Sequence, residues 1–208
     1  MSLLVVDLWR HGALTGAPCL NGRSDVAADI DDARRLADAV ALRLPDAILS
    51  SPLQRCRQPA QLAAERLAMG CATEPALTEW DFGNWDGLSL AQLHRDQGDA
   101  VAAFWQAPHD NPPPQGETLA QFQRRVLAWW YPWRQSAQGH HALLTHGGVI
   151  RILVADVLGL TPAQFGGLLR LGIDYGSRTT LSLWREGGVC HSHIQTVNYC
   201  SSARSSND

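Results

Sequence analysis

Short apolar runs and longer amphipathic stretches follow one another along the chain. Three apolar runs have the length and flanking residues of buried strands: LLVVDLW (3–9), DAILS (46–50) and HALLT (141–145). The spacing of apolar positions predicts helices over 32–44, 54–69, about 89–106, about 117–130, 148–158 and 161–170. Alternation of apolar and polar residues predicts two more strands over 179–184 and 189–197. Strands that alternate with helices predict an α/β fold, here a three-layer α/β/α sandwich around a mostly parallel central sheet.

Proline marks the predicted ends of several elements. Pro45 and Pro132 lack the N–H that a helix interior needs, so each is expected to stop the helix before it. Pro59 falls inside segment 54–69 and must sit in its first turn or kink it. The stretch PHDNPPPQG (108–116) excludes helix and central strand, so we interpret it as a connection.

The chain has 208 residues, enough for one domain with a substantial core. We expect this domain over residues 1–200, with a small helical insertion at about 84–118 that could cover a site. The polar tail over 201–208 is expected to be disordered. No apolar run reaches membrane-spanning length and the short apolar start lacks a basic leader, so a cytoplasmic location is the default expectation.

Composition and charge argue against some classes of protein. The net charge of -3 argues against a nucleic-acid-binding protein, which would usually show a strongly basic face. All 17 basic residues are Arg, so any cationic anion-binding group must be Arg or His. The 5 cysteines are odd in number and show no CxxC spacing, so neither a zinc site nor a disulfide framework is expected.

Three polar segments follow the predicted strands directly. They are RHG (10–12), SPLQR (51–55) and HGG (146–148), and the last also opens a helix. In open α/β sheets, ligands bind beyond the carboxyl ends of the strands, so these segments should meet at one rim. Two His and two Arg would then lie beside a helix N-terminus, which is itself an anion site. The ligand that fits this set is a phosphoryl group.

These residues can supply the parts of a phosphate-ester reaction. Arg10 and Arg55 can neutralise the phosphoryl oxygens through forked hydrogen bonds. Neighbouring Arg charges disfavour protonated imidazole, which keeps His11 neutral and nucleophilic. The leaving alkoxide needs an acid, and Glu79 in the loop ALTEWDFGNWDG (76–87) is the best candidate. The charge of a bound phosphate dianion favours the protonated form of a neighbouring carboxyl.

Each residue also has a structural explanation when it is taken alone. RHG can arise by chance, His146 can be a core or capping residue, and Arg55 can cap a helix or pair at the surface. Glu79 can be a solvated loop carboxylate. The functional interpretation is favoured because all four positions follow apolar strands or lie in the aromatic loop, in a compatible order.

Other clusters give weaker signals. His191 and His193 share a face of a predicted strand, but no suitably spaced third ligand accompanies them, so no metal site is predicted. The pair at 140–141 is expected at a surface turn before a strand. Trp80 and Trp85 flank the candidate acid and could desolvate it or stack on an aromatic substrate such as a benzimidazole.

Four segments together resemble the histidine phosphatase superfamily, the phosphoglycerate mutase-like proteins. They span roughly residues 3–160 in the expected order: LWRHG (8–12), SSPLQRCRQPAQLAA (50–64), EWDFGNWDG (79–87) and LLTHGGVIR (143–151). RHG alone is weak evidence, but the four segments together are highly specific. The resemblance implies a phosphoric monoester hydrolase that needs no metal or other cofactor.

The resemblance also assigns roles to residues. In the family the histidine of RHG is phosphorylated and the arginine before it binds phosphate, which gives His11 and Arg10. The arginine after S-P-L also binds phosphate, which gives Arg55. The glutamate that opens the third segment is the proton donor, which gives Glu79.

The same resemblance gives further contacts to the phosphoryl group. The second histidine, His146, contacts the transferred group, and the following backbone N–H, that of Gly147, often assists. Asn21 lies in the early loop, the loop that includes CLNGR (19–23) and differs from the family pattern, and it could still contact phosphate. The chain departs from the common R-H-G-E/Q-T pattern at positions 13–14, where Ala and Leu stand. These changes bear on substrate identity rather than on chemistry.

Within the family, EWDFGNWDG and PPPQGETLAQFQRRV (112–126) look like alpha-ribazole phosphatases of cobalamin biosynthesis. The leading substrate is therefore a small phosphorylated metabolite, alpha-ribazole 5'-phosphate. A phosphoglycerate mutase or a broad-specificity sugar-phosphate phosphatase is the alternative. A non-catalytic phospholigand-binding protein would be expected to have lost His11 or Glu79, and neither is lost. No nucleic-acid or membrane partner is expected, and the sequence leaves a homodimer open.

Overall fold

The structure, a computed structural model, describes residues 2–16, 18–187 and 189–200, so the tail expected over 201–208 lies outside the described residues. The strands are β1 (Ser2–Arg10), β2 (Ala47–Ser50), β3 (Cys71–Thr73), β4 (Gly139–Thr145), β5 (Arg178–Glu186) and β6 (Val189–Tyr199). The α-helices are α1 (Ile30–Ala41), α2 (Gln54–Arg66), α3 (Leu90–Gln106), α4 (Leu119–Ser136), α5 (Gly147–Val157) and α6 (Phe165–Leu168). Short 3-10 helices are η1 (Pro75–Leu77), η2 (Gly83–Trp85) and η3 (Pro162–Gln164).

The six strands form one mixed sheet in the order β3-β2-β4-β1-β5-β6. The pairs β1–β4, β2–β4 and β2–β3 are parallel, whereas β5 runs antiparallel to both β1 and β6. Only β5 is reversed, so β1 to β4 all end at the same edge. The predicted α/β fold with a mostly parallel sheet is confirmed.

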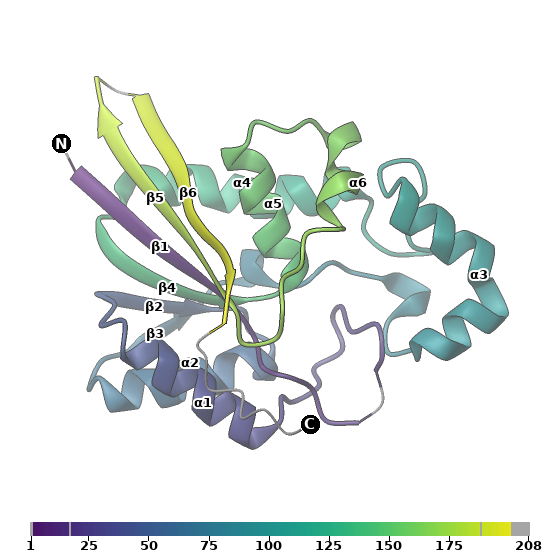
Figure 1. Cartoon of the computed structure of the whole chain (residues 1–208), viewed down its shortest axis with the longest axis horizontal. Coiled ribbons are helices and arrows are strands. Elements are labelled where there is room, and N and C mark those ends of the chain that lie inside the picture. The colour runs from purple at the N-terminus through teal and green to yellow at the C-terminus, as the bar shows by residue number, and fades with distance from the viewer. Residues whose placement is uncertain (1, 17, 188, 201–208) are drawn as a thin grey trace.

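The sheet separates two apolar cores. On β1, Leu4, Val6 and Leu8 point to one face and pack with buried residues of α4 and α5. Trp9 points to the other face, where it packs with buried residues of α1 and α2. Figure 1 shows α1 and α2 below the sheet and α4 and α5 above it. The alternation along β1 therefore supplies one strand to both outer layers of the sandwich.

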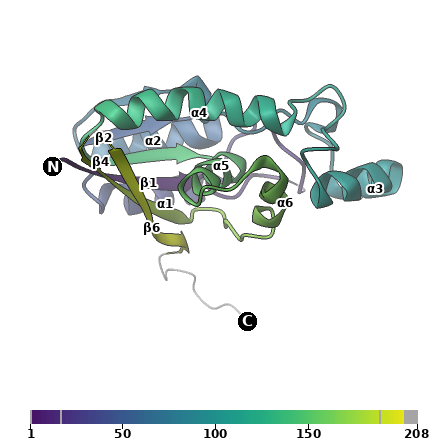
Figure 2. The same ribbon diagram turned by 90° about the horizontal axis from the view of Figure 1, so that it is seen from above.

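Helix α3 lies within the segment of about 84–118, where we expected a helical insertion. Ser89 caps it by accepting a hydrogen bond from the Gln92 N–H. The helix is kinked at Gln97, whose Oε1 accepts a 2.7 Å bond from Nε1 of Trp85. Its buried contacts come from Leu93, Val101 and Phe104. Figures 1 and 2 show α3 standing beyond the end of the molecule toward which β1 and β4 point.

Two predictions around the fourth helix are wrong. Helix α4 does not stop before Pro132 but continues to Ser136. Pro132 lies on the exposed side of the helix, and Arg134 in the next turn is held by Asp156 at 2.8 Å. The residue pair 140–141 lies inside β4 rather than in a turn. His140 faces Asp7 on β1, with Nε2 2.8 Å from the carboxylate, and this contact fixes it in the strand.

Two further elements differ from expectation. The sequence did not indicate β3, which has three half-buried or exposed residues and no apolar run. The helix expected over 161–170 is reduced to η3 followed by the single turn of α6. None of the helices in the described part of the chain combines the length and the apolar character that a membrane span requires.

Candidate active site

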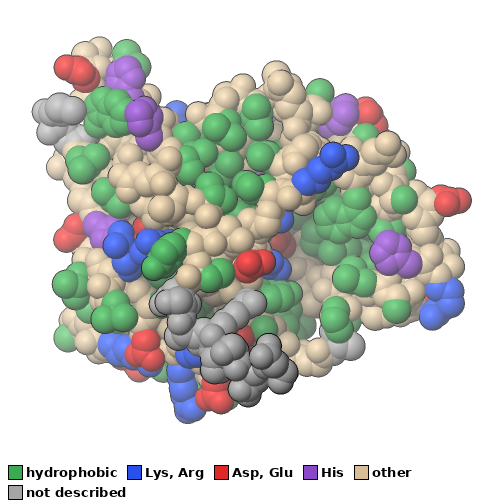
Figure 3. Space-filling view, in the orientation of Figure 1, with side chains coloured by type: hydrophobic (Ala, Val, Ile, Leu, Met, Phe, Trp, Pro, Cys, Tyr) green, Lys and Arg blue, Asp and Glu red, His purple; other side chains and the backbone are tan. Residues whose placement is uncertain are grey.

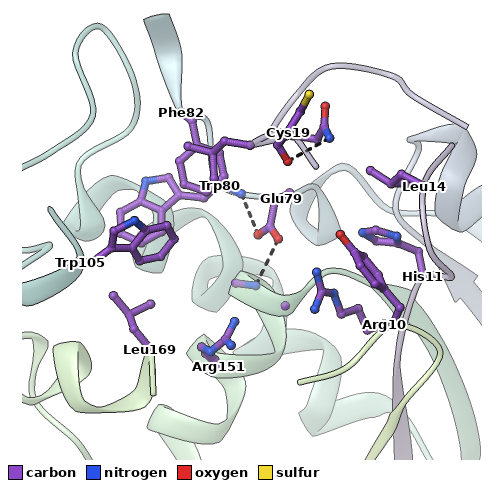
Figure 4. Close-up of a pocket in the computed structure, with 15 residues that line it drawn as sticks. Arg10, His11, Leu14, Cys19, Glu79, Trp80, Phe82, Trp105, Arg151 and Leu169 are labelled. Carbon is purple, nitrogen blue, oxygen red and sulfur yellow. Dashed lines mark hydrogen bonds between the residues drawn. The ribbon is translucent and has the colours of Figure 1, made fainter. Parts of the chain in front are cut away.

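A pocket of about 150 Å³ opens beyond the carboxyl ends of β1 and β4. Figure 4 shows Arg10 and His11 at one end, Trp105 and Leu169 at the other, and Glu79 between them. The N-terminus of α5 forms part of the wall through Gly147 and Gly148. The pocket therefore has a cationic end and an apolar end, joined by one carboxylate.

His11 stands just past the end of β1 and is 5% exposed. Its Nδ1 lies 2.7 Å from the Gly12 carbonyl oxygen, which can only accept, so Nδ1 carries the proton. Burial, and then the charges of Arg55 and Arg10, lower the pKa of His11 well below its ordinary value. The imidazole is therefore neutral, with the lone pair on Nε2.

Arg10 is held so that part of its guanidinium remains available. Nη1 donates to the Ile173 carbonyl, and Cζ lies 3.9 Å from the centre of the Tyr175 ring. Nε is buried and has no hydrogen-bond partner among the residues that the structure describes. Gly147 lies beside this nitrogen: a Cβ added to Gly147 would stand 3.7 Å from it. A buried N–H without a partner next to a helix N-terminus is suited to an anion.

Glu79 reaches the first turn of α5 from the loop between η1 and η2. Its Oε2 accepts a 3.2 Å bond from the Gly148 N–H, and its Oε1 accepts one of 3.0 Å from the Trp80 N–H. A Cβ on Gly148 would stand 2.2 Å from Oε1 of Glu79. Glycine at this position is therefore what lets the carboxylate approach the helix.

His146 is the residue just before α5, at its N-cap position, and is fully buried. Nε of Arg55 donates to its Nδ1 at 3.3 Å, so Nε2 carries the proton and donates to Ser51 Oγ at 2.8 Å. Burial, then Arg55, lower the pKa of His146 well below its ordinary value. The rings of His146 and His11 are 5.2 Å apart, which places His146 behind the nucleophile.

Arg55 lies in the first turn of α2 and is fully buried. Nη1 donates to the Ser24 carbonyl and Nη2 to the Gly22 carbonyl, both at 2.6 Å. The guanidinium is thus bound to the early loop and to His146 and does not border the pocket. The structure brings Arg55 next to His11 but does not place it, or His146, on the pocket surface.

The remaining predicted residues border the pocket. Asn21 lines it, with Nδ2 bonded to the Cys19 carbonyl at 3.2 Å. Gly147 is the first residue of α5, as expected from the HGG segment. The structure therefore places Arg10, Asn21 and Gly147 on the pocket surface.

Arg151 is a pocket residue that sequence reasoning did not single out. Nε and Nη2 donate to the carbonyls of Leu168 and Leu171 at 3.0 and 2.7 Å. Nη1 lies 2.9 Å from the Cβ position of Gly147, so it faces the phosphate end. The spacing could have revealed it, because positions 147 and 151 share one face of a helix.

Aromatic and aliphatic side chains form the other end of the pocket. Trp80, Phe82 and Leu169 border it, and Trp105 stands at its edge with 40% of its surface exposed. In the space-filling view, hydrophobic side chains gather beside α3 and in the recess between α3 and the body of the molecule (Figure 3). Trp85, expected near the substrate, is instead a core residue, 1% exposed, that supports α3.

In the described part of the chain, no three side chains of the types His, Cys, Asp and Glu lie close enough together to bind one metal ion. His191 and His193 do share a face of β6, but both pack on Trp184 of β5, with ring centres 5.4 and 4.6 Å away. Their spacing therefore reflects aromatic packing across two strands.

Comparisons with known proteins identify the family of this chain. The profile of the histidine phosphatase superfamily (branch 1) matches residues 6–196. A 2,3-bisphosphoglycerate-dependent phosphoglycerate mutase of Parvibaculum lavamentivorans is 27% identical over 168 residues, which cover 77% of this chain and 79% of the mutase. The match covers only 32% of the length of some longer mycobacterial relatives.

Solved structures share the fold over nearly the whole chain. Mycobacterial glucosyl-3-phosphoglycerate phosphatase in complex with inorganic phosphate superposes with a TM-score of 0.80, at 26% identity, covering 96% of this chain and 98% of that one. The alpha-ribazole phosphatase of Shigella flexneri gives a TM-score of 0.75 at 19% identity, covering 94% and 96%.

Proposed function

Because the chain belongs to the histidine phosphatase superfamily and is a phosphoric monoester hydrolase of that type, we propose that His11 carries the phosphoryl group during turnover. The observation that supports this assignment most directly is the bond from Nδ1 of His11 to the Gly12 carbonyl. It leaves Nε2 unprotonated at the pocket, and the lowered pKa keeps it so at neutral pH.

The first half-reaction forms a phosphohistidine. Nε2 of His11 attacks phosphorus while the bond to the ester oxygen breaks, and Glu79, protonated in the complex, gives its proton to that oxygen. Arg10 and the first-turn amides of α5 neutralise charge on the phosphoryl oxygens. In the second half-reaction Glu79 accepts a proton from water as the water oxygen attacks phosphorus, and the bond to Nε2 breaks.

Arg55 and His146 act on the phosphoryl side in this proposal. In the free protein both lie behind His11, and burial followed by the charge of Arg55 keeps the pKa of His11 low. On binding, Arg55 exchanges one early-loop carbonyl for a phosphoryl oxygen, and His146 turns an N–H toward the same group. Catalytic hydrogen bonds often tighten only in the complex, so the free arrangement is compatible with these contacts. Asn21 contributes its side-chain amide from the pocket wall.

The substrate is a small phosphate monoester, and we favour alpha-ribazole 5'-phosphate. The apolar end of the pocket supports this choice, because Trp105, Phe82 and Leu169 suit a planar apolar group better than a polyhydroxylated one. A mutase is the second candidate, since the Parvibaculum relative is described as one. A mutase must protect phosphohistidine from water, so the two candidates differ in the rate of hydrolysis.

A panel of substrates tests the proposal. Phosphate release would be measured with alpha-ribazole 5'-phosphate, 3-phosphoglycerate and fructose phosphates, with and without EDTA. We expect release to be unaffected by EDTA and fastest with alpha-ribazole 5'-phosphate. Rapid quenching in alkali should trap a phosphoenzyme that is stable in alkali and labile in acid. Dependence on a metal would overturn the phosphohistidine mechanism, and isomerisation of 3-phosphoglycerate without phosphate release would favour a mutase.

A further inference from the structure

The loop that carries Glu79 has little secondary structure of its own, because it runs between two short 3-10 helices. A side chain from another helix holds its backbone. Nη1 of Arg125, on α4, donates to the carbonyls of Ala76 and Thr78, and Nη2 donates to the carbonyl of Glu79, each at 3.1 Å. One guanidinium therefore fixes three carbonyls at and just before the proposed acid.

Arg125 is in turn fixed by Glu117. Nε and Nη2 of Arg125 bond to the two carboxylate oxygens at 2.8 and 2.9 Å, a two-pronged pair with strong directional preference. The Asp81 N–H also donates to this carboxylate at 3.1 Å. Burial raises the pKa of Glu117, but its bonds to Arg125 and to the Asp81 N–H lower it below the ordinary value. Glu117 is therefore ionised.

The backbone of Glu117 adds to the same connection. Its N–H donates to the Asp81 carbonyl at 2.9 Å, and its carbonyl accepts from Nε1 of Trp80 at 2.8 Å. Arg125 thus holds the residues before Glu79, and Glu117, just before α4, holds the two residues after it. Neither Arg125 nor Glu117 borders the pocket, and the bonds of both go to the loop backbone and to each other.

We propose that Glu117 and Arg125 form a positioning pair that keeps the Glu79 carboxyl at the N-terminus of α5. The inference rests on the proposed function, because it takes Glu79 to be the general acid. The carboxyl must meet the leaving oxygen at hydrogen-bond distance, and a displacement of about 1 Å can cost about 100-fold in rate. The pair acts on protonation of the leaving oxygen and leaves the position of His11 unchanged.

Helix α4 offers a matched control. Its second ion pair, Arg134 with Asp156, has a similar distance of 2.8 Å and similar burial, with side chains 16% and 10% exposed against 21% and 14% for Arg125 and Glu117. It ties α4 to α5 through Asp156, which also accepts from Trp130. Loss of this pair should weaken packing without touching the loop of the acid.

The test compares Glu117→Gln with Asp156→Asn. Phosphoenzyme formation would be measured for p-nitrophenyl phosphate, whose leaving group needs no proton, and for glycerol 3-phosphate, whose alkoxide does. We expect Glu117→Gln to slow the glycerol ester about 10- to 100-fold and the nitrophenyl ester less than about 3-fold. Asp156→Asn should affect both esters equally. Equal losses in Glu117→Gln, or the same selective loss in the control, would overturn the proposal.

Two more variants separate the possible failures. Glu79→Gln should show the same selectivity for leaving groups, and if it does not, the acid assignment itself is wrong. If Glu79→Gln is selective and Glu117→Gln is not, only the positioning role is wrong. Arg125→Lys keeps the charge but cannot make the fork, so it serves as the test if Glu117→Gln does not fold, which thermal unfolding would reveal. A non-selective Arg125→Lys variant would likewise contradict the pair.

Discussion

The two ends of the pocket are built from different parts of the chain. The phosphate end stands on β1 and on the junction of β4 with α5, so its residues follow buried strands of the sheet. The apolar end is formed by α3, by Leu169 just after α6 and by the loop around Trp80, which lie outside the sheet. Backbone bonds in register fix the first end, whereas side-chain packing and hydrogen bonds that involve side chains fix the second.

This difference suggests that the phosphate end carries out the chemistry and the apolar end recognises the leaving group. Chemistry on phosphorus needs atoms fixed to fractions of an ångström, and strand ends supply this because each is bonded on both sides. Recognition of a leaving group tolerates variation, and loops on a rigid scaffold can change without harm to the fold. We therefore expect changes at the phosphate end to affect all substrates alike and changes at the apolar end to affect them unequally.

The largest effect is expected for His11→Ala. Without the nucleophile, turnover should fall by at least about 10⁴-fold for every ester, whatever its leaving group. Phosphate release and trapping of the phosphoenzyme in alkali would measure it, and thermal unfolding would show that the variant is folded. Near-normal turnover would refute the nucleophile assignment, and a loss limited to some esters would break the comparison between the two ends.

Gly148→Ala should have the next largest effect. The new Cβ would stand 2.2 Å from Oε1 of Glu79 and must displace the acid. We expect kcat/KM for alkyl phosphates to fall about 10- to 100-fold, with a smaller loss for p-nitrophenyl phosphate. Gly98→Ala is the control, because a Cβ at Gly98 meets no heavy atom of the described residues within 4 Å. An unchanged rate in Gly148→Ala would show that the carboxyl need not approach α5.

Trp105→Ala tests the apolar end. Removal of this half-exposed ring should lower kcat/KM for a substrate with a planar apolar leaving group about 10-fold, and for glycerol 3-phosphate hardly at all. Tyr199→Ala removes an exposed aromatic ring outside the pocket and should change neither substrate. Equal losses for both esters would mean that Trp105 supports the fold of the site rather than its selectivity.

The smallest effect on turnover is expected for Asp7→Asn, in the sheet beneath the phosphate end. Burial raises the pKa of Asp7, but its bonds to His140, Thr180 and Arg43 outweigh this and lower it to about 2. This carboxylate therefore stabilises the fold above the unfolded pKa of 3.8, and the contribution is lost as the pH falls toward 2.

The contribution of Asp7 amounts to about 2 kcal/mol of unfolding free energy. Urea unfolding between pH 5 and pH 2 should show this loss in the parent protein and not in Asp7→Asn. Relative rates on the two classes of ester should be equal in both proteins at neutral pH. An unchanged pH dependence in the variant would remove Asp7 as the source of the loss.

The phosphate end could be predicted from the sequence because it follows from strand order. Apolar runs at 3–9, 46–50 and 141–145 indicated strands, and the residues after them had to meet at one edge. His11, Arg10 and Gly147 do border the pocket there. The sequence could not show that Arg55 and His146 lie behind the pocket, because the direction of a side chain depends on carbonyls of a loop that has no periodic pattern.

The apolar end and the helix ends were harder to predict. Trp85 and Trp105 are chemically alike, yet one packs in the core and the other borders the pocket, and only tertiary packing separates them. The prediction for Pro132 failed because Arg134 and its partner Asp156 hold the final turn of α4 despite the missing N–H. Such contacts between residues far apart in sequence leave no local signal.

Helix α3 has a consequence for how the protein responds to heat. It lies outside the sheet, is kinked at Gln97, and is attached through three buried side chains. Segments with few buried contacts open at a lower free energy than the fold as a whole. Warming should therefore release α3 and Trp105 while β1 and the phosphate end stay folded. We expect the enzyme to become indiscriminate among phosphate esters at temperatures where it still hydrolyses them.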